Sequence, residues 1–335
     1  MSAVTQPLEA RRSIPQTIGN FLRDNPIYVA IVGLVVVTSI VEPKFLSYTN
    51  FDNIIRSAGT LIFAALGMTF VIMAGFIDLS IGGIISLVAV VTVTLVDRVG
   101  QGPAILIGLL LGLTCGLINS GLILSSGALT QAESLFITFG MSLVYGAVAL
   151  MYVQGVTQFL TYSESDISIF NAINSGTIGF LSVFTALAIV CFVILLIIER
   201  RTYMGRAVVL TGGNKTAARL AGIPISKSIV MIYAISGLLS AVGAVVLVSR
   251  VTLADPTMGT PYMTQAILAV VVGGTALAGG RGSVLWTVVG TFLLVLLNNC
   301  LNLLGVSSYI QFMVWGVILI IVIWLDTVKQ ARVRG

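Results

Sequence analysis

The stretch that decides the fold runs from Glu199 to Lys227 and reads ERRTYMGRAVVLTGGNKTAARLAGIPISK. It is a polar interruption between two long apolar blocks. Asn214 is suited to cap the first turn of a helix, Gly222 to end that helix in a left-handed conformation, and Pro224 to prevent its continuation. The stretch therefore predicts a helix of about two turns just outside an apolar domain.

The predicted short helix has two different faces. Ala217, Leu220 and Ala221 are spaced i, i+3 and i+4, so they share an apolar face. Lys215 and Arg219 are spaced i, i+4 and form a basic flank. Such a helix could dock onto a soluble partner, or it could rest on anionic lipid headgroups. The spacing alone is equally compatible with both interpretations.

Composition places the chain in a membrane. Of its 335 residues, 57% are hydrophobic and only 9% are charged, against roughly 25% charged in a soluble domain. The apolar runs lack strict two-residue alternation and are about 20 residues long, which is the length of a helix that crosses a bilayer. Histidine is absent, which disfavours a metal site and a histidine proton relay. We therefore predict an all-α integral membrane protein without a bound metal.

The apolar pattern predicts about ten membrane segments in one membrane domain. The segment at 266–272 is short and runs into Gly273 and Gly274, which indicates a broken or re-entrant helix. The predicted segments are 26–41, 57–75, 79–96, 103–124, 134–152, 178–198, 229–248, 266–272, 284–299 and 308–325. The predicted organisation is a tail at 1–25, an N-terminal half at 26–198, a loop at 199–227, a C-terminal half at 228–325 and a basic tail at 326–335.

The basic residues orient the chain. With the N-terminus in the cytosol, all but four of the 17 lysines and arginines fall on the cytosolic side. The exceptions are Lys44, Arg56, Arg98 and Arg250. Because cytosolic loops carry the excess of positive charge, both termini and the loop at 199–227 are predicted to be cytosolic.

Asp78 and Ser80 stand between two apolar runs with almost no loop to hold them. An ionisable group near membrane depth is costly, so Asp78 is a candidate for function. It could instead cap the helix predicted to begin at residue 79, where a carboxylate also suits the helix dipole. In the next predicted segment, Gly108, Gly112 and Gly116 repeat every fourth residue, which predicts a ridge for close helix packing.

Amides are the other polar groups predicted at membrane depth, and they include Asn119, Asn298, Asn299 and Asn302. Such groups could line a path for an uncharged, hydroxylated solute, or they could form hydrogen bonds between helices. Several buried acids, which an ion-coupled carrier would favour, are lacking from the predicted segments.

Enzymatic motifs are not apparent in the sequence. Gly274 to Gly279 has the spacing of a phosphate-binding loop, but Gly280-Arg281-Gly282 follows in place of Lys and Ser or Thr. The sequence also lacks a nucleophile elbow and a metalloprotease motif. The chain is therefore predicted to be a transport component and not an enzyme.

Four segments together resemble the permease subunit of bacterial ABC importers of the ribose type. The resemblance runs in order from about Asn50 to Asp326, although Gly83 and Tyr145-Gly146 depart from residues that are usual in that family. The segments are FIDLSIG at 76–82, TYMGR at 202–206 with GGN at 212–214 and AARLAGI at 217–223, VGGTALAGGRG at 272–282, and LNNCLNLLGV at 297–306.

The resemblance implies a translocation subunit of the inner membrane that imports a monosaccharide. Its implied partners are cytosolic subunits that bind ATP and Mg, a periplasmic sugar-binding protein and a second permease copy, with no nucleic acid and no cofactor on this chain. Asp78, Ser80, Gly273, Gly274, Asn298, Asn299 and Asn302 are the candidates for the pathway or for helix breaks. The residues implied to couple to the ATPase are Gly205, Arg206, Gly213, Asn214, Lys215, Ala217, Ala218, Arg219, Leu220, Ala221 and Gly222. A related permease for branched-chain amino acids or nucleosides, or an ion-coupled carrier, are the alternatives.

Overall fold

The structure is a computed structural model that describes residues 26–179 and 181–334. It is a bundle of long helices with two short antiparallel strand pairs, β1 with β4 and β2 with β3. The helices are α2 (Pro26–Val41), α3 (Tyr48–Met73), α4 (Ile81–Val99), α5 (Gln101–Ser126), α6 (Gln131–Tyr152), α7 (Ser168–Ser175), α8 (Val183–Arg201), α9 (Tyr203–Gly213), α10 (Lys215–Leu220), α11 (Ile225–Val251), α12 (Thr260–Val272), α13 (Val284–Leu303) and α14 (Ser308–Arg334). The remaining elements are η1 (Pro43–Leu46), β1 (Gln158–Phe159), η2 (Leu160–Tyr162), β2 (Thr177–Ile178), β3 (Leu181–Ser182) and β4 (Leu253–Ala254).

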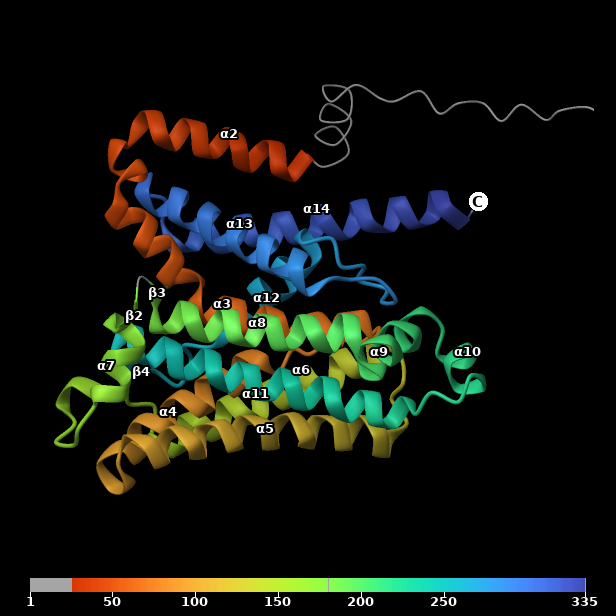
Figure 1. Cartoon of the computed structure of the whole chain (residues 1–335), viewed down its shortest axis with the longest axis horizontal. Helices are drawn as coiled ribbons and strands as arrows, with labels where there is room; N and C mark the ends of the chain where they lie inside the picture. Colours follow the sequence, from red (N-terminus) through yellow and green to blue (C-terminus); the bar gives the residue numbers. More distant parts are fainter. Residues whose placement is uncertain (1–25, 180, 335) are drawn as a thin grey trace, which may run out of the picture.

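The predicted fold class is confirmed. Within the described residues, eight helices are long and apolar enough to cross a membrane, and two shorter apolar helices, at Ile31–Val41 and Thr260–Val272, complete the ten predicted segments. Figure 1 shows the long helices running side by side, with α10 at one end and α7, β2 and β3 at the other. The C-terminus lies at the same end as α10. We call the α10 end cytosolic and the opposite end outer, following the charge distribution.

The core of the bundle is formed by α3, α4 and α11. Most of the apolar stretch of each of these helices is buried inside the protein, whereas α6, α8 and α14 bury less than a quarter of theirs. Because lipid is as apolar as leucine, the exposed apolar side chains of these outer helices suit the membrane. The buried core therefore holds the polar groups that lipid could not solvate.

The predicted glycine ridge on α5 is confirmed as a packing surface. A Cβ atom on Gly116 would lie 2.1 Å from the backbone oxygen of Tyr233, and one on Gly112 would lie 2.7 Å from the backbone oxygen of Gly237. Both contacts are with α11. The third glycine, Gly108, faces Thr92 of α4. The ridge thus lets α5 approach the backbone of α11 and, at Gly108, the side chains of α4.

Replacing Gly116 with leucine should separate α5 from α11. Overpacking costs typically 1–3 kcal/mol, and here the obstacle is backbone that cannot change rotamer. We expect a clear fall in the thermal unfolding temperature and in the yield of monodisperse protein in mild detergent. Gly121→Leu on the same helix is the control, because a Cβ there meets nothing within 4 Å. Equal behaviour of the two variants would contradict the packing role.

Several helix boundaries differ from the predicted ones. α3 begins at Tyr48 and not near Ser57, because Ser47 caps it and an Arg56–Asp52 pair, 2.6 Å apart, allows polar turns to extend beyond the bilayer. α8 begins at Val183 because the β2–β3 hairpin occupies the residues before it.

The two predicted tails have different outcomes. The residues of the predicted basic tail at 326–335 are helical and continue α14 to Arg334, because no glycine or proline interrupts the helix. The predicted cytosolic tail at 1–25 lies outside the described residues.

Candidate functional site

The predicted short helix is confirmed as α10, with the predicted signals at both ends. The Asn214 side chain caps the helix by accepting a hydrogen bond of 2.9 Å from the backbone N–H of Ala217. Gly222 has a φ of 76°, and Ile223 donates to the carbonyl of Ala218 across the end of the helix. Cap chemistry is local, which is why the sequence sufficed to place this helix.

One side of α10 is anchored and the other is free. Ala218 is buried with Ala207 of α9 and Ile223 in a small apolar cluster. Leu220 is 85% exposed, and its neighbours on the predicted apolar face, Ala217 and Ala221, are exposed as well. α10 is therefore fixed to the protein through Ala218 and presents Leu220 at the surface.

The predicted basic flank is wrong in one of its two members. Lys215 does not stand at the surface beside Arg219, because its ammonium group donates a hydrogen bond to the carbonyl of Leu129 and lies 3.9 Å from the ring centroid of Phe76. Burial lowers the pKa of Lys215, and the Glu133 carboxylate opposes this shift. Lys215 therefore ties α10 to the membrane domain, and Arg219 is the exposed cation of the pair.

Gly205 makes the turn that positions α9. The Thr202 hydroxyl caps α9 by accepting from the backbone N–H of Gly205, and a Cβ atom on Gly205 would lie 2.3 Å from the carbonyl oxygen of Glu199. Only glycine fits there without displacing backbone. The Glu199 carboxylate in turn accepts a 3.0 Å hydrogen bond from the backbone N–H of Val284, at the start of α13. Arg206, on the next turn, is exposed.

The C-terminal end of α9 touches two other chain segments at backbone distance. The Gly280 N–H donates a 2.9 Å hydrogen bond to the carbonyl oxygen of Met73, the last residue of α3. A Cβ atom on Gly212 would lie 1.9 Å from that oxygen and 2.5 Å from the Gly280 nitrogen. We call Met73, Gly212 and Gly280 the glycine joint. It connects the α9–α10 segment with the end of α3 and with the connection between α12 and α13.

Residues 74–80 form a break between α3 and α4, at the level of the membrane. The break passes from the glycine joint into the core, where it meets Ser236 of α11. Ser236 lies about three turns into α11, roughly 16 Å from its cytosolic end at the rise of an α-helix. Asp78 therefore sits well inside the bundle, and its side chain is fully buried.

The Asp78 carboxylate is held by hydroxyl and backbone groups. Its Oδ1 accepts from the Ser80 backbone N–H at 3.0 Å and from the Ser80 hydroxyl at 2.6 Å, and its Oδ2 accepts from the Ser236 hydroxyl at 2.7 Å. Asn119 donates to the Ser80 hydroxyl at 2.7 Å, and Tyr145 donates to the Asn119 carbonyl at 3.0 Å. We call Asp78, Ser80, Asn119, Tyr145 and Ser236 the Asp78 network.

The structure revises both interpretations of Asp78, as a helix cap and as a functional group at membrane depth. α4 begins at Ile81, so Ser80 and not Asp78 occupies the N-cap position. The carboxylate nevertheless accepts the Ser80 N–H just before the helix, which suits the helix dipole. Asp78 and Ser80 are fully buried, so they do not contact a solute in this conformation. Through the Asp78 network they connect residues 74–80 with α5, α6 and α11.

The C-terminal asparagines form hydrogen bonds between elements. Asn299 pairs with Asn50 through both of their amides, and Asn298 accepts a 2.6 Å hydrogen bond from the Trp315 indole. Asn302 accepts one of 2.7 Å from Gln311. Of the two interpretations of the membrane-depth amides, these three therefore fit hydrogen bonding between helices.

The other predicted break is also observed. α12 ends at Val272, and Gly274 has a φ of 88°, so the chain leaves the helix at Gly273 and Gly274 as predicted.

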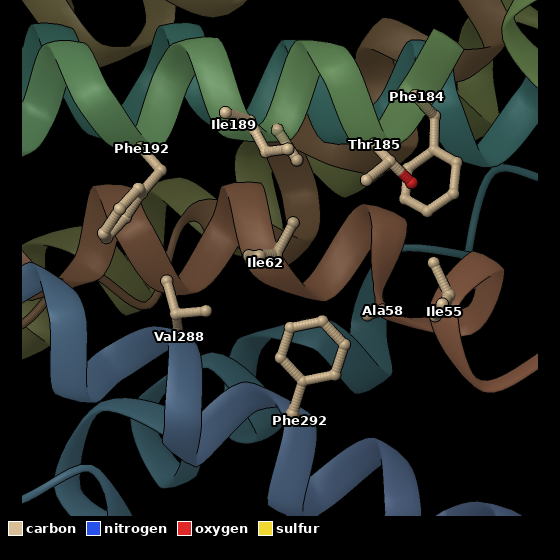
Figure 2. Close-up of a pocket in the computed structure, with 10 residues that line it drawn as sticks. Ile55, Ala58, Ile62, Phe184, Thr185, Ile189, Phe192, Val288 and Phe292 are labelled. Atoms are coloured by element: carbon tan, nitrogen blue, oxygen red, sulfur yellow. The ribbon is translucent and has the colours of Figure 1, made fainter. Parts of the chain in front are cut away.

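Hollows within the bundle differ in polarity. Figure 2 shows one of about 130 Å³ between α3, α8 and α13, with aromatic and aliphatic side chains around it. Its one hydroxyl, on Thr185, is hydrogen-bonded to Ser182. A second hollow, of about 320 Å³, lies between α4, α6 and α12 and includes Ser86 and Ser142. A third, of about 450 Å³, lies between α11, α12 and α14 at the outer end.

Comparison with known proteins identifies the family. Residues 50–323 match the family described as branched-chain amino acid transport system, permease component. The chain is 37% identical to the ribose import permease protein of Bacillus subtilis over 301 residues, which cover 89% of this chain and 91% of that protein. It is 33% identical to a probable ABC transporter permease protein of Sinorhizobium fredii over 309 residues, which cover 91% of this chain and 89% of that protein.

A sugar permease of another kind matches as well. The chain is 31% identical to the galactose/methyl galactoside import permease protein of Escherichia coli over 331 residues, which cover 93% of this chain and 96% of that protein. No solved structure matches significantly. The relatives and the eight apolar helices make this chain a multi-pass protein of the inner membrane. The chain belongs to the family of transport-system permease components.

Proposed function

We propose that this chain is the translocation subunit of an ATP-driven importer for a monosaccharide. The observation that carries the proposal is α10, an anchored helix whose exposed Leu220 is connected through α9 and the glycine joint to the break at Asp78. A displacement of α10 by a cytosolic partner would therefore be transmitted to the helices in the membrane core. The importer names of the relatives support this direction of transport.

The proposed partners are those that the import-permease and ABC-transporter names of the relatives imply. Cytosolic subunits that bind ATP and Mg would dock on α10, a periplasmic binding protein would deliver the sugar, and a second permease copy would complete the pathway. This chain itself would carry no cofactor and perform no catalysis. Residues 1–25, 26–198, 199–227, 228–325 and 326–335 would be the tail, the two membrane halves, the coupling loop and the basic tail of this subunit.

The solute class rests on the relatives. The family description mentions branched-chain amino acids, whereas the relatives that match over about nine-tenths of the chain include proteins named for ribose and galactose. A monosaccharide is therefore favoured over an amino acid or a nucleoside. An ion-coupled carrier is disfavoured because Asp78 is the one buried carboxylate among the residues that the structure describes, and hydroxyls hold it.

Leu220→Glu should uncouple transport while leaving the membrane domain folded. The substitution puts a charge on the exposed face of α10 and removes no buried contact. We expect loss of the co-purified ATPase and at least a tenfold fall in ATP-dependent sugar uptake into vesicles. Leu46→Glu is the control, because Leu46 is 75% exposed at the outer end. Normal co-purification and uptake by Leu220→Glu would refute the docking role.

Vesicle uptake separates the proposed function from the carrier alternative. Uptake should stop when ATP is removed and should persist when an uncoupler dissipates the proton gradient. The reverse result would mean that the chain works as an ion-coupled carrier.

A further inference from the structure

The third hollow has the composition of a sugar site. It lies between α11, α12 and α14 at the outer end of the bundle and has a volume of about 450 Å³, within the usual range of small-molecule pockets. Aromatic side chains and amides line it together. The residues that matter are Tyr262, Gln265, Ser308, Gln311, Phe312 and Trp315.

Gln265 is the most informative of these residues. It is only 8% exposed, yet its amide has no hydrogen-bond partner in the part of the chain that the structure describes. The Gln265 amide is not among the fully buried polar atoms without a partner in the described residues, so its atoms keep some accessible surface, and the residue lines the hollow. A solute in the hollow would satisfy the Gln265 carbonyl oxygen and the Gln265 NH₂ group at once.

Gln311 adds a second acceptor, and its orientation is fixed. Its NH₂ group donates 2.7 Å to the Asn302 side chain and 2.9 Å to the carbonyl of Val306. Both donor positions are thereby used, and the carbonyl oxygen of the side chain accepts no hydrogen bond within the described residues. Gln311 is 6% exposed, so this oxygen is held in place beside the hollow.

The aromatic wall is fixed as well. The Trp315 indole donates to Asn298 at 2.6 Å, and the rings of Phe312 and Trp315 pack edge to face with centroids 5.0 Å apart. The indole N–H is therefore occupied, which leaves the rings as apolar surface. Apolar walls with a few placed polar groups are typical of small-molecule sites.

The other two hollows lack this combination. In the hollow of Figure 2 the lone hydroxyl is already bonded, so it offers a solute no polar partner. In the hollow between α4, α6 and α12 the Ser86 hydroxyl accepts from the backbone N–H of Gly259, and the Thr257 hydroxyl donates to Asp255. The Ser142 and Thr260 hydroxyls there have no partner within the described residues, but no amide lines this hollow. The outer hollow is the one of the three that amide side chains line, those of Gln265 and Gln311.

We infer that the hollow between α11, α12 and α14 is a weak binding site for a hydroxylated monosaccharide at the outer half of the pathway, with Gln265 and Gln311 as its hydrogen-bonding groups. The inference rests on the proposed function. Two adjacent sugar hydroxyls would donate to the amide oxygens of Gln265 and Gln311, and the Gln265 NH₂ group would donate to a sugar oxygen.

Gln265→Met is the decisive variant because fold and function should respond in opposite directions. Methionine has a similar volume, and replacing an unpartnered amide with an apolar group should leave the unfolding temperature unchanged or raise it. ATP-dependent uptake of radiolabelled D-ribose and D-galactose by the complete transporter should fall about tenfold. Thr114→Val is the control, because Thr114 bonds only its own helix at Leu110 and is exposed. A Gln265→Met transporter with wild-type uptake would overturn the inference, and so would one whose uptake falls only in proportion to its folded amount.

A labelling experiment distinguishes a sugar site from a lipid site. Gln265→Cys in the assembled transporter should react from the outer side with a charged, membrane-impermeant methanethiosulfonate, because a sugar pathway contains water. Reaction with a lipid-soluble maleimide alone would mean that an acyl chain fills the hollow, and the inference would fail. Failure of the proposed function is separate, because it would abolish ATP-dependent uptake by the unmodified transporter itself.

Discussion

Gly212→Ala should abolish transport, although it adds a single methyl group. The Cβ atom would lie 1.9 Å from the Met73 carbonyl oxygen and 2.5 Å from the Gly280 nitrogen. Both atoms belong to backbone, so no side chain can rotate to make room. The glycine joint must open, and the 2.9 Å hydrogen bond from Gly280 to Met73 must break or lengthen.

The expected result is a folded but uncoupled protein. The joint lies at the cytosolic end of the core, where Met73 is buried, and we expect a loss of stability of about 1–3 kcal/mol, as for other overpacked sites. ATP-dependent sugar uptake should fall at least a hundredfold, while the ATPase still co-purifies because Leu220 is unchanged. Uptake into vesicles, normalised to the folded transporter, measures this directly.

Gly213→Ala supplies the matched control at the next position. A Cβ atom there meets only Gly280 Cα, at 3.9 Å, which is ordinary contact. Its uptake should stay within about twofold of the unmodified protein, since surface substitutions usually change stability by less than 0.5 kcal/mol. If Gly212→Ala and Gly213→Ala have the same ATP-dependent uptake, the glycine joint does not couple movement of α10 to the core.

Local sequence signals predicted the local parts of this site. Asn214 and Gly222 mark the ends of α10 because capping depends on neighbours within one turn. The ridge at Gly112 and Gly116 was predictable because a repeat of four residues places them on one face. In the same way, Gly274 marks the end of α12.

The remaining parts depend on residues far apart in the sequence. Lys215 looked like a surface cation because no periodicity connects it with Leu129 or Phe76. Ser236 and Tyr145 were missed as partners of the Asp78 network because a serine or tyrosine in a membrane helix carries no signal of what it bonds. A buried acid predicts that partners exist, but the fold decides which ones they are.

Asp78→Ala should destabilise the protein more than any substitution outside the core. The carboxylate accepts three hydrogen bonds, from the Ser80 N–H, the Ser80 hydroxyl and the Ser236 hydroxyl. Each donor left unsatisfied in a buried site costs about 1–3 kcal/mol, so the loss amounts to several kcal/mol. We expect little monodisperse protein in mild detergent, a much lower unfolding temperature and no uptake. Asp52→Ala is the control, because its pair with Arg56 is at the surface and worth about 0–1 kcal/mol.

Asp78→Asn decides whether the carboxylate acts through its hydrogen bonds or through its charge. The amide oxygen can take the place of Oδ1 and keep both bonds from Ser80. The NH₂ group then faces the Ser236 hydroxyl, which can reverse and accept, since a hydroxyl both donates and accepts. The bonds from Ser80 and the contact with Ser236 are kept, whereas the Ser236 hydroxyl hydrogen and the second amide N–H have no acceptor. Asp78→Asn should therefore keep most, but not all, of the stability that Asp78→Ala loses. An asparagine variant as unstable as the alanine variant would show that the negative charge, and not the hydrogen-bonded shape of the break, holds α4 in the core.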